Sequence, residues 1–108
     1  MAPDSAAAPE APLYEFYLYV SGATPNSTRA LRNIKEICEH YLPGRYVLRI
    51  IDMYQQPELA QQEQIIAAPT LVRRQPQPRR QLVGDLSNRA AVLAILGIDH
   101  LPPATPTP

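Results

Sequence analysis

The 108-residue sequence predicts a single small α/β domain, and three observations support that prediction. The length leaves room for one domain only. Segments rich in aromatic and β-branched residues alternate along the chain with segments whose apolar residues recur every three or four positions. The two ends, 1–12 and 99–108, are rich in Pro and lack such a period, so we expect disordered tails around a domain at 13–98.

The first part of the domain predicts a strand followed by a long helix. The segment 14–20, YEFYLYV, is rich in aromatic and β-branched residues, which is typical of a strand. The helix is expected to open near Pro25, with Asn26 or Ser27 as its N-cap. Its apolar residues recur at three- and four-residue steps and therefore share one face: Leu31, Ile34, Cys38 and Tyr41.

A Pro-Gly pair at 43–44 ends this helix, and a second strand at 46–51 then completes a βαβ unit. The right-handed crossover rule makes the two strands of this unit parallel. Pro57 suits the first turn of a short helix at 58–65. The apolar segment 66–72 is interrupted by Pro69 and predicts a loop that leads into a third strand.

The last part of the domain predicts a hairpin and a helix. The turn QPQP at 75–78 leads to a returning strand at 80–83. A final helix is expected at 88–96, capped by Ser87 and ended by Gly97. The full order, βαβαββα, is the thioredoxin-like arrangement, an α/β fold in which helices cover a mixed sheet.

Five residues near the strand ends are expected to define the loops of this fold: Gly22, Pro25, Pro69, Gly84 and Asp85. The bond before Pro69 is either cis, as in thioredoxin-like folds, or trans at a strand start, and the topology favours cis. Asp52 and Asp85 each follow a strand, and we expect turn and helix-cap roles for them rather than acid–base chemistry.

The sequence lacks the residues of a redox or metal site. Cys38 is its only cysteine, which excludes an internal disulfide, a CxxC pair and a cysteine zinc site, and we expect it to be buried. The segment 22–27, where thioredoxin-like folds carry redox cysteines, contains no sulfur. His40 and His100 have few acids nearby that could share a metal. We therefore expect no enzyme activity, no metal and no cofactor.

The composition favours a soluble protein of the reducing cytoplasm. No apolar run is long enough to span a membrane, and the start of the chain lacks the features of a signal peptide. The segment 13–98 contains ten basic and seven acidic residues, a net charge of +3. Nine of the ten basic residues are Arg, whose forked guanidinium suits contacts with carboxylates, so a protein partner is indicated.

Two arginine pairs, Arg73-Arg74 and Arg79-Arg80, flank the predicted hairpin turn. We expect these four side chains to gather, together with Arg29, at one end of the domain. Such a cluster either protects an edge strand by its charge or docks an acidic partner. Nucleic acid is a weaker option, because no aromatic residues are interleaved with the arginines.

Four segments, in order and at matching spacing, resemble a known family. They are LYVSGATPNSTRAL at 18–31, VLRIID with QPELA at 47–60, IIAAPTL at 65–71 and QLVGDLSNR at 81–89. All four resemble segments of the circadian clock protein KaiB family. The resemblance covers about 14–96, which is nearly the whole predicted domain.

The resemblance implies a non-enzymatic clock adaptor. Members of the KaiB family bind the amino-terminal ATPase ring of KaiC, help to sequester KaiA and tune the phosphorylation cycle of KaiC. The family has two folds: a tetrameric ground state ordered βαββααβ, and a monomeric thioredoxin-like state that binds KaiC. The sensor domain of the clock kinase SasA shares the thioredoxin-like form and competes for the same ring.

The residues near the carboxy-terminal end of the domain favour the thioredoxin-like monomer over the ground state. The ground state requires a strand at 92–96, but the alanines in and around this segment form helices better than strands. Ile95 also stands where the clock proteins often have Gly.

Some features depart from the family pattern. Gln81 replaces one Arg of an RR pair, Gln77 interrupts a three-proline turn, and a Pro-rich end replaces acidic residues. These departures leave open a diverged KaiB-like paralogue, or a SasA-like sensor, that binds another KaiC-type ATPase. A thioredoxin-like redox enzyme is a third alternative, which the single cysteine disfavours.

Overall fold

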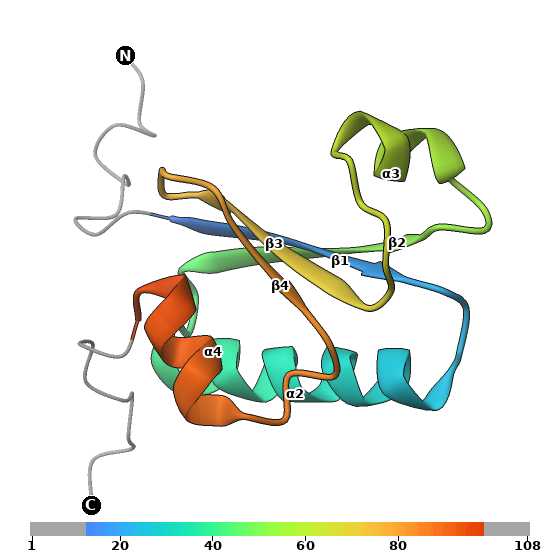
Figure 1. The fold of residues 1–108 in the computed structure, drawn as a ribbon. Helices are drawn as coiled ribbons and strands as arrows, with labels where there is room; N and C mark the ends of the chain where they lie inside the picture. Colours follow the sequence, from blue (N-terminus) through green and yellow to red (C-terminus); the bar gives the residue numbers. More distant parts are fainter. Residues whose placement is uncertain (1–12, 99–108) are drawn as a thin grey trace, which may run out of the picture.

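The computed structural model describes residues 13–98 (Figure 1), and the tails expected at 1–12 and 99–108 lie outside the described residues. Four strands form one sheet in the order β2-β1-β3-β4. The elements are β1 (Tyr14–Val20), α2 (Pro25–Tyr41), β2 (Tyr46–Asp52), α3 (Pro57–Gln62), β3 (Thr70–Gln75), β4 (Arg80–Val83) and α4 (Arg89–Leu96). β2 is parallel to β1, whereas β3 is antiparallel to both β1 and β4. The predicted order βαβαββα and its mixed sheet are therefore confirmed.

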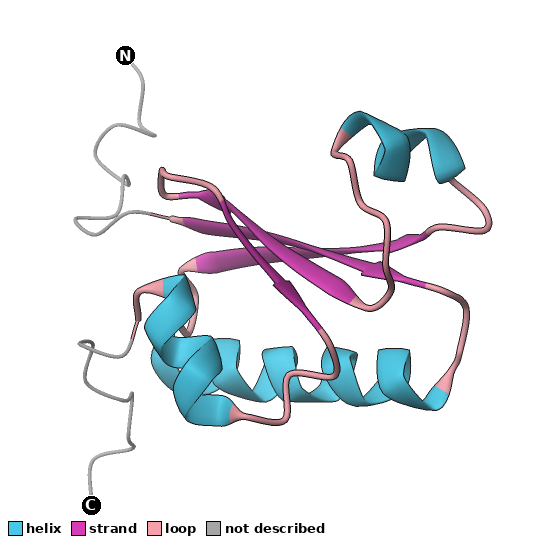
Figure 2. Ribbon diagram, viewed as in Figure 1, coloured by secondary structure: helices cyan, strands magenta, loops and turns pink. Residues whose placement is uncertain are grey.

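The sheet carries helices on both faces. Figure 2 shows α2 and α4 against one face and the short α3 against the other. Because successive side chains of a strand point to opposite faces, β1 supplies residues to both layers. Phe16 and Leu18 belong to the cluster with α2 and α4, while Tyr19 belongs to the smaller cluster with α3.

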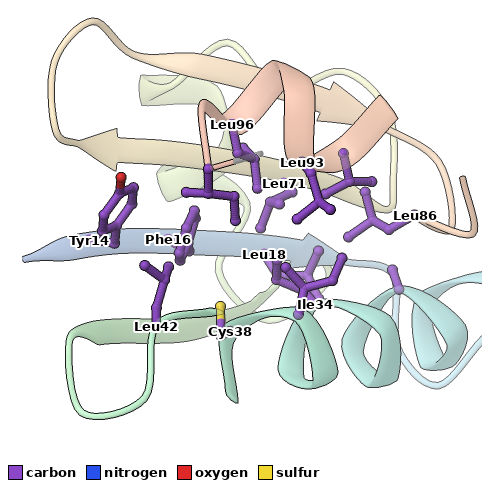
Figure 3. Close-up of a cluster of buried hydrophobic side chains, with 14 of the residues drawn as sticks. Tyr14, Phe16, Leu18, Ile34, Cys38, Leu42, Leu71, Leu86, Leu93 and Leu96 are labelled. Carbon is purple, nitrogen blue, oxygen red and sulfur yellow. The ribbon is translucent and has the colours of Figure 1, made fainter. Parts of the chain in front are cut away.

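The larger core lies between β1, α2 and α4 (Figure 3). Phe16 and Leu18 are fully buried there, and so is Cys38, which confirms the expected burial of the thiol. Burial raises the pKa of the Cys38 thiol to about 12. Leu31 and Tyr41, on the apolar face predicted for α2, only border this core.

The N-cap of α2 is Thr24 rather than Asn26 or Ser27. The Thr24 Oγ1 accepts a hydrogen bond from the Ser27 N–H at 3.4 Å. Ser27 is buried instead, and its Oγ accepts from the Ser21 N–H at 3.3 Å. The predicted caps were wrong because Pro25 is itself the first residue of the helix. The N–H of a first helical residue has no partner within the helix, so proline, which lacks it, fits there. The N-cap is therefore the residue before Pro25.

The helix α3 is shorter than the predicted helix at 58–65, because it ends at Gln62. Gln64 adopts a positive φ of 59°, which breaks the helical path. Ile65 then packs into the smaller core instead of extending the helix.

The helix α4 begins one residue later than expected. Its N-cap is Asn88 rather than Ser87, and the Asn88 Oδ1 accepts a hydrogen bond from the Ala91 N–H at 3.1 Å. Gly97 ends the helix, as predicted, with a left-handed φ of 75°.

The start of β3 and the end of β4 are joined through Pro69. The Ala68–Pro69 bond is cis, the isomer that the topology favoured, and the bonds before Pro76 and Pro78 are cis as well. The Gly84 N–H donates to the Pro69 carbonyl at 2.9 Å. Gly84 has a φ of 121°, which residues with a side chain rarely adopt, so a glycine suits this junction.

Replacing Cys38 by Ala should lower the free energy of unfolding by about 1 kcal/mol, because a buried sulfur is lost from a packed core. Urea unfolding measures this loss. In the unchanged protein, a thiol reagent should label Cys38 far more slowly than free cysteine, since the side chain is buried and its pKa is raised. Labelling at the rate of free cysteine would contradict the burial.

Candidate functional site

The β3–β4 hairpin places its arginines on two different faces of the sheet. Arg73 pairs with Arg80 across the two strands. Because side chains alternate along β3, Arg73 and Arg74 point in opposite directions. The hairpin therefore divides the predicted cluster instead of gathering it on one surface.

Arg73 is not part of an exposed surface, which corrects the role predicted for it. It is only 6% exposed. Its Nη1 donates to the Leu96 carbonyl at the end of α4, and its Nη2 donates to the Pro78 carbonyl in the hairpin turn at 2.6 Å. Burial lowers the pKa of this guanidinium, and the negative end of the α4 dipole favours its charge. Arg73 thus joins α4 to the hairpin.

Arg29 lies away from the hairpin turn, so its predicted place in the cluster was also wrong. Its Nε is 3.4 Å from an Asp85 carboxylate oxygen, and Asp85 follows the end of β4. Val83, the last residue of β4, pairs with Thr70 at the start of β3, which is the end of the sheet opposite the turn. The return of β4 therefore carries the partner of Arg29 away from the other arginines.

Asp85 has the turn role expected of it. Its carboxylate accepts a hydrogen bond from the Ser87 N–H at 3.1 Å. The hydrogen bonds from Ser87, and then the Arg29 guanidinium, hold the pKa of this carboxyl below its ordinary value. Asp85 thereby fixes the loop between β4 and α4 to the surface of α2.

Arg74 and Arg79 meet at one carboxylate, that of Glu63 at the end of α3. Arg74 Nη1 lies 3.3 Å and Arg79 Nε lies 3.2 Å from its oxygens. The Arg74 guanidinium also sits 4.8 Å from the centre of the Tyr17 ring, a cation–π contact. Sequence reasoning missed Glu63, although it is the only acidic residue between Glu58 and Asp85 and therefore the last one before the hairpin.

Three of the five predicted arginines remain exposed on the hairpin, and we call this set the arginine hairpin: Arg74 and Arg79, which meet Glu63, and Arg80, which begins the edge strand β4 and shares the face of its partner Arg73. The side chains of Arg74 and Arg79 are each 39% exposed, and Arg80 is exposed. On either side of α3, two large apolar side chains stand in solvent: Tyr54 is 77% and Ile66 is 93% exposed. Glu63 ties the end of α3 to the hairpin, so Arg74 and Arg79 reach the face of the sheet that α3 covers.

The loop after β1, where thioredoxin-like folds carry redox cysteines, contains no group for that chemistry. An open hollow of about 320 Å³ there is lined by Ser21, Thr24, Pro25, Asn26 and Ala68. Gly22 turns the chain nearby with a φ of 64°. Residues 13–98 hold no group of His, Cys, Asp and Glu arranged to bind a metal. In the same part of the chain, no helix has the length and apolar character needed to cross a membrane.

Residues 17–98 match the family model described as KaiB domain. The circadian clock oscillator protein KaiB of Prochlorococcus marinus subsp. pastoris is 49% identical over 88 residues, which cover 82% of this chain and 80% of that protein. The protein of the same name from Thermosynechococcus vestitus is 46% identical over 94 residues, covering 87% of this chain and 85% of that protein.

Solved structures with the same fold include the N-terminal domain of Synechococcus elongatus SasA. It has a TM-score of 0.64 and 25% identity, and the match covers 86% of this chain and 93% of that domain. Chloroplastic thioredoxin z has a TM-score of 0.65 at 18% identity, covering 81% of this chain and 79% of that one, which shows the fold alone. The thioredoxin-like fold and the likeness to the SasA sensor domain, both predicted from the sequence, are confirmed.

Replacing Arg73 by Met should lower the free energy of unfolding by about 3 kcal/mol, because the Leu96 and Pro78 carbonyls lose a charged donor in a buried site. The control is Arg80→Met, on the facing residue of β4, which is exposed and should cost less than about 0.5 kcal/mol. Urea unfolding of both variants makes the comparison. Equal losses would show that Arg73 does not hold α4 to the hairpin.

Proposed function

The chain belongs to the KaiB family, and we propose that it is a circadian clock adaptor with no catalytic activity of its own. It binds the amino-terminal ATPase ring of a KaiC-type protein, modulates the phosphorylation cycle of that protein and helps to sequester KaiA. The observation that carries the proposal is the match of residues 17–98 to the KaiB domain, at up to 49% identity to clock oscillator proteins.

The fold supports this role. The resemblance to the KaiB family assigns KaiC binding to the thioredoxin-like monomer and the order βαββααβ to a tetrameric ground state. The chain has the thioredoxin-like order and resembles the SasA domain that adopts the same fold. It therefore has the form expected to bind the ring, and we propose that it acts as a monomer in the cytoplasm.

We assign the docking surface to the arginine hairpin and the adjoining α3. The three arginines offer guanidinium groups to an acidic ring surface, where charge complementarity steers association. The exposed Tyr54 and Ile66 add apolar side chains of the kind that anchor protein interfaces. An interface of apolar anchors with a charged rim fits this side of the molecule.

A sensor-like role is the second candidate. The SasA domain, at 25% identity, lies close enough in structure to favour it, and Gln81 and Ile95 depart from the KaiB pattern. A diverged paralogue or SasA-like sensor would bind another KaiC-type ATPase through the same surface. A redox enzyme is disfavoured, because Cys38 is buried with a pKa raised to about 12; an insulin-reduction assay should show no turnover.

A pull-down with the KaiC-type ATPase of the same genome, in ATP and in ADP, tests the function directly. We expect the unchanged protein to be retained by the ring. Retention in neither nucleotide would contradict the proposed adaptor role. If several KaiC-type proteins are present, the one that is retained distinguishes the clock adaptor from the paralogue.

Changing Arg79 and Arg80 together to Glu should weaken binding to this ATPase about tenfold or more, because repulsion replaces attraction at the ring. The effect should shrink as salt rises above about 0.15 M, since exposed charges are screened. Biolayer interferometry measures both. The control is Arg32→Glu with Lys35→Glu on exposed positions of α2, which makes the same change of charge outside the hairpin. Equal weakening in both variants would remove the hairpin from the docking surface.

Changing Tyr54 and Ile66 together to Ala should also weaken binding about tenfold or more, because exposed apolar anchors contribute most at interfaces. Stability should change by less than about 0.5 kcal/mol, since the side chains are 77% and 93% exposed. Val83→Ala, at 61% exposure on β4, is the matched control. Normal binding by the double variant would place α3 outside the interface.

A further inference from the structure

Glu63 accepts hydrogen bonds from guanidinium groups that the proposed docking surface would otherwise offer to a partner. Its Oε1 accepts from Arg79 Nε at 3.2 Å, and its Oε2 accepts from Arg74 Nη1 at 3.3 Å. Its backbone carbonyl accepts from Arg79 Nη2 at 3.3 Å. One edge of the Arg79 guanidinium is therefore turned to Glu63, and both carboxylate oxygens are in use.

The position of Glu63 is unfavourable for a carboxylate on the helix alone. Glu63 is the C-cap of α3, where the last carbonyls of a helix present a negative potential that favours cations. The two guanidinium groups supply the compensating charge. The carboxylate is thus held by the arginines rather than by the helix that carries it.

The ion pairs of Glu63 with Arg74 and Arg79 are also exposed enough for a partner carboxylate to replace Glu63. The side chain of Glu63 is 24% exposed, and those of Arg74 and Arg79 are each 39% exposed. Ion pairs at such exposure contribute about fivefold or less each to an equilibrium constant. A partner carboxylate can therefore replace Glu63 at small cost, provided that it arrives with further contacts.

We propose that Glu63 is an internal counter-ion, which an acidic segment of the protein partner displaces from Arg74 and Arg79 when it docks. The inference rests on the proposed function only in that the docking surface is the same. Arg80 is exposed, and the ion pairs within residues 13–98 leave it without a carboxylate. An acidic segment at the edge strand β4 contacts Arg80 and competes with Glu63 for the neighbouring Arg79. Segments with two or more neighbouring carboxylates therefore bind, whereas single anions compete poorly.

The experiment removes the charge of Glu63 and keeps its shape. In Glu63→Gln the arginines lose their internal carboxylate, so binding of a hexaglutamate peptide should tighten about three- to tenfold over the unchanged protein. The matched control is Glu58→Gln, an exposed acid on the same helix that makes no ion pair within residues 13–98. It makes the same charge change and should shift the affinity less than about twofold. NMR titration at low salt measures all three proteins.

The result overturns the inference if Glu63→Gln binds the peptide no more tightly than Glu58→Gln, or more weakly than the unchanged protein. The unchanged protein gives a second readout that does not depend on folding of a variant. Its Glu63 carboxyl carbon signal should move as the peptide is added, while that of Glu58 stays, and an unmoved Glu63 signal also overturns the inference. The peptide arm is separate from the ATPase pull-down, so failure of the counter-ion role and failure of the adaptor role give different patterns.

Discussion

The central strand β1 is the constraint on which the other elements depend. It pairs with β2 in parallel on one side and with β3 in antiparallel on the other. Its alternating side chains enter both hydrophobic clusters, so one strand fixes the positions of α2 and α4 on one face and of α3 on the other. The arginine hairpin follows from the same pairing, because β3 is registered on β1 and β4 is registered on β3.

The buried guanidinium of Arg73 adds directional hydrogen bonds to this largely apolar packing. The side chains of Val92, Leu93 and Leu96 bury α4 against the sheet, which any helix with the same apolar face would do. Arg73 adds hydrogen bonds to the Leu96 and Pro78 carbonyls, and these require a helix that ends at Leu96. A strand at 92–96, as in the ground-state order of the family, would not present that carbonyl as the end of a helix. The buried Arg73 therefore favours the thioredoxin-like packing over the ground-state packing. Two packings of one sequence can differ so little in free energy that a few residues decide between them.

The sequence was sufficient for features that arise from local patterns and insufficient for those that arise from distant contacts. The strand β1, the burial of Cys38 and the end of α4 at Gly97 follow from periodicity and turn chemistry within a few residues. The partner of Arg29 lies 56 residues away and that of Arg73 lies 23 residues away. Adjacent arginines in the sequence gave no sign that one would be buried and one exposed. That division comes from the alternation of a strand whose two faces are covered differently.

The docking side of the molecule is built on its least anchored helix, and this has a consequence for partner choice. The helix α3 has six residues, of which only Ala60 is buried. Elements with few buried contacts open most readily, so the Glu63 contacts with the hairpin add to the small apolar contact that holds α3 on the sheet. A partner that takes Arg74 and Arg79 from Glu63 also loosens α3, and it must restore that order through contacts of its own. A segment that offers only carboxylates binds without restoring that order, whereas a surface that also packs on Tyr54 and Ile66 restores it and binds more tightly. The same ion pairs that hold α3 in place therefore favour a folded acidic surface with an apolar patch over a purely electrostatic ligand.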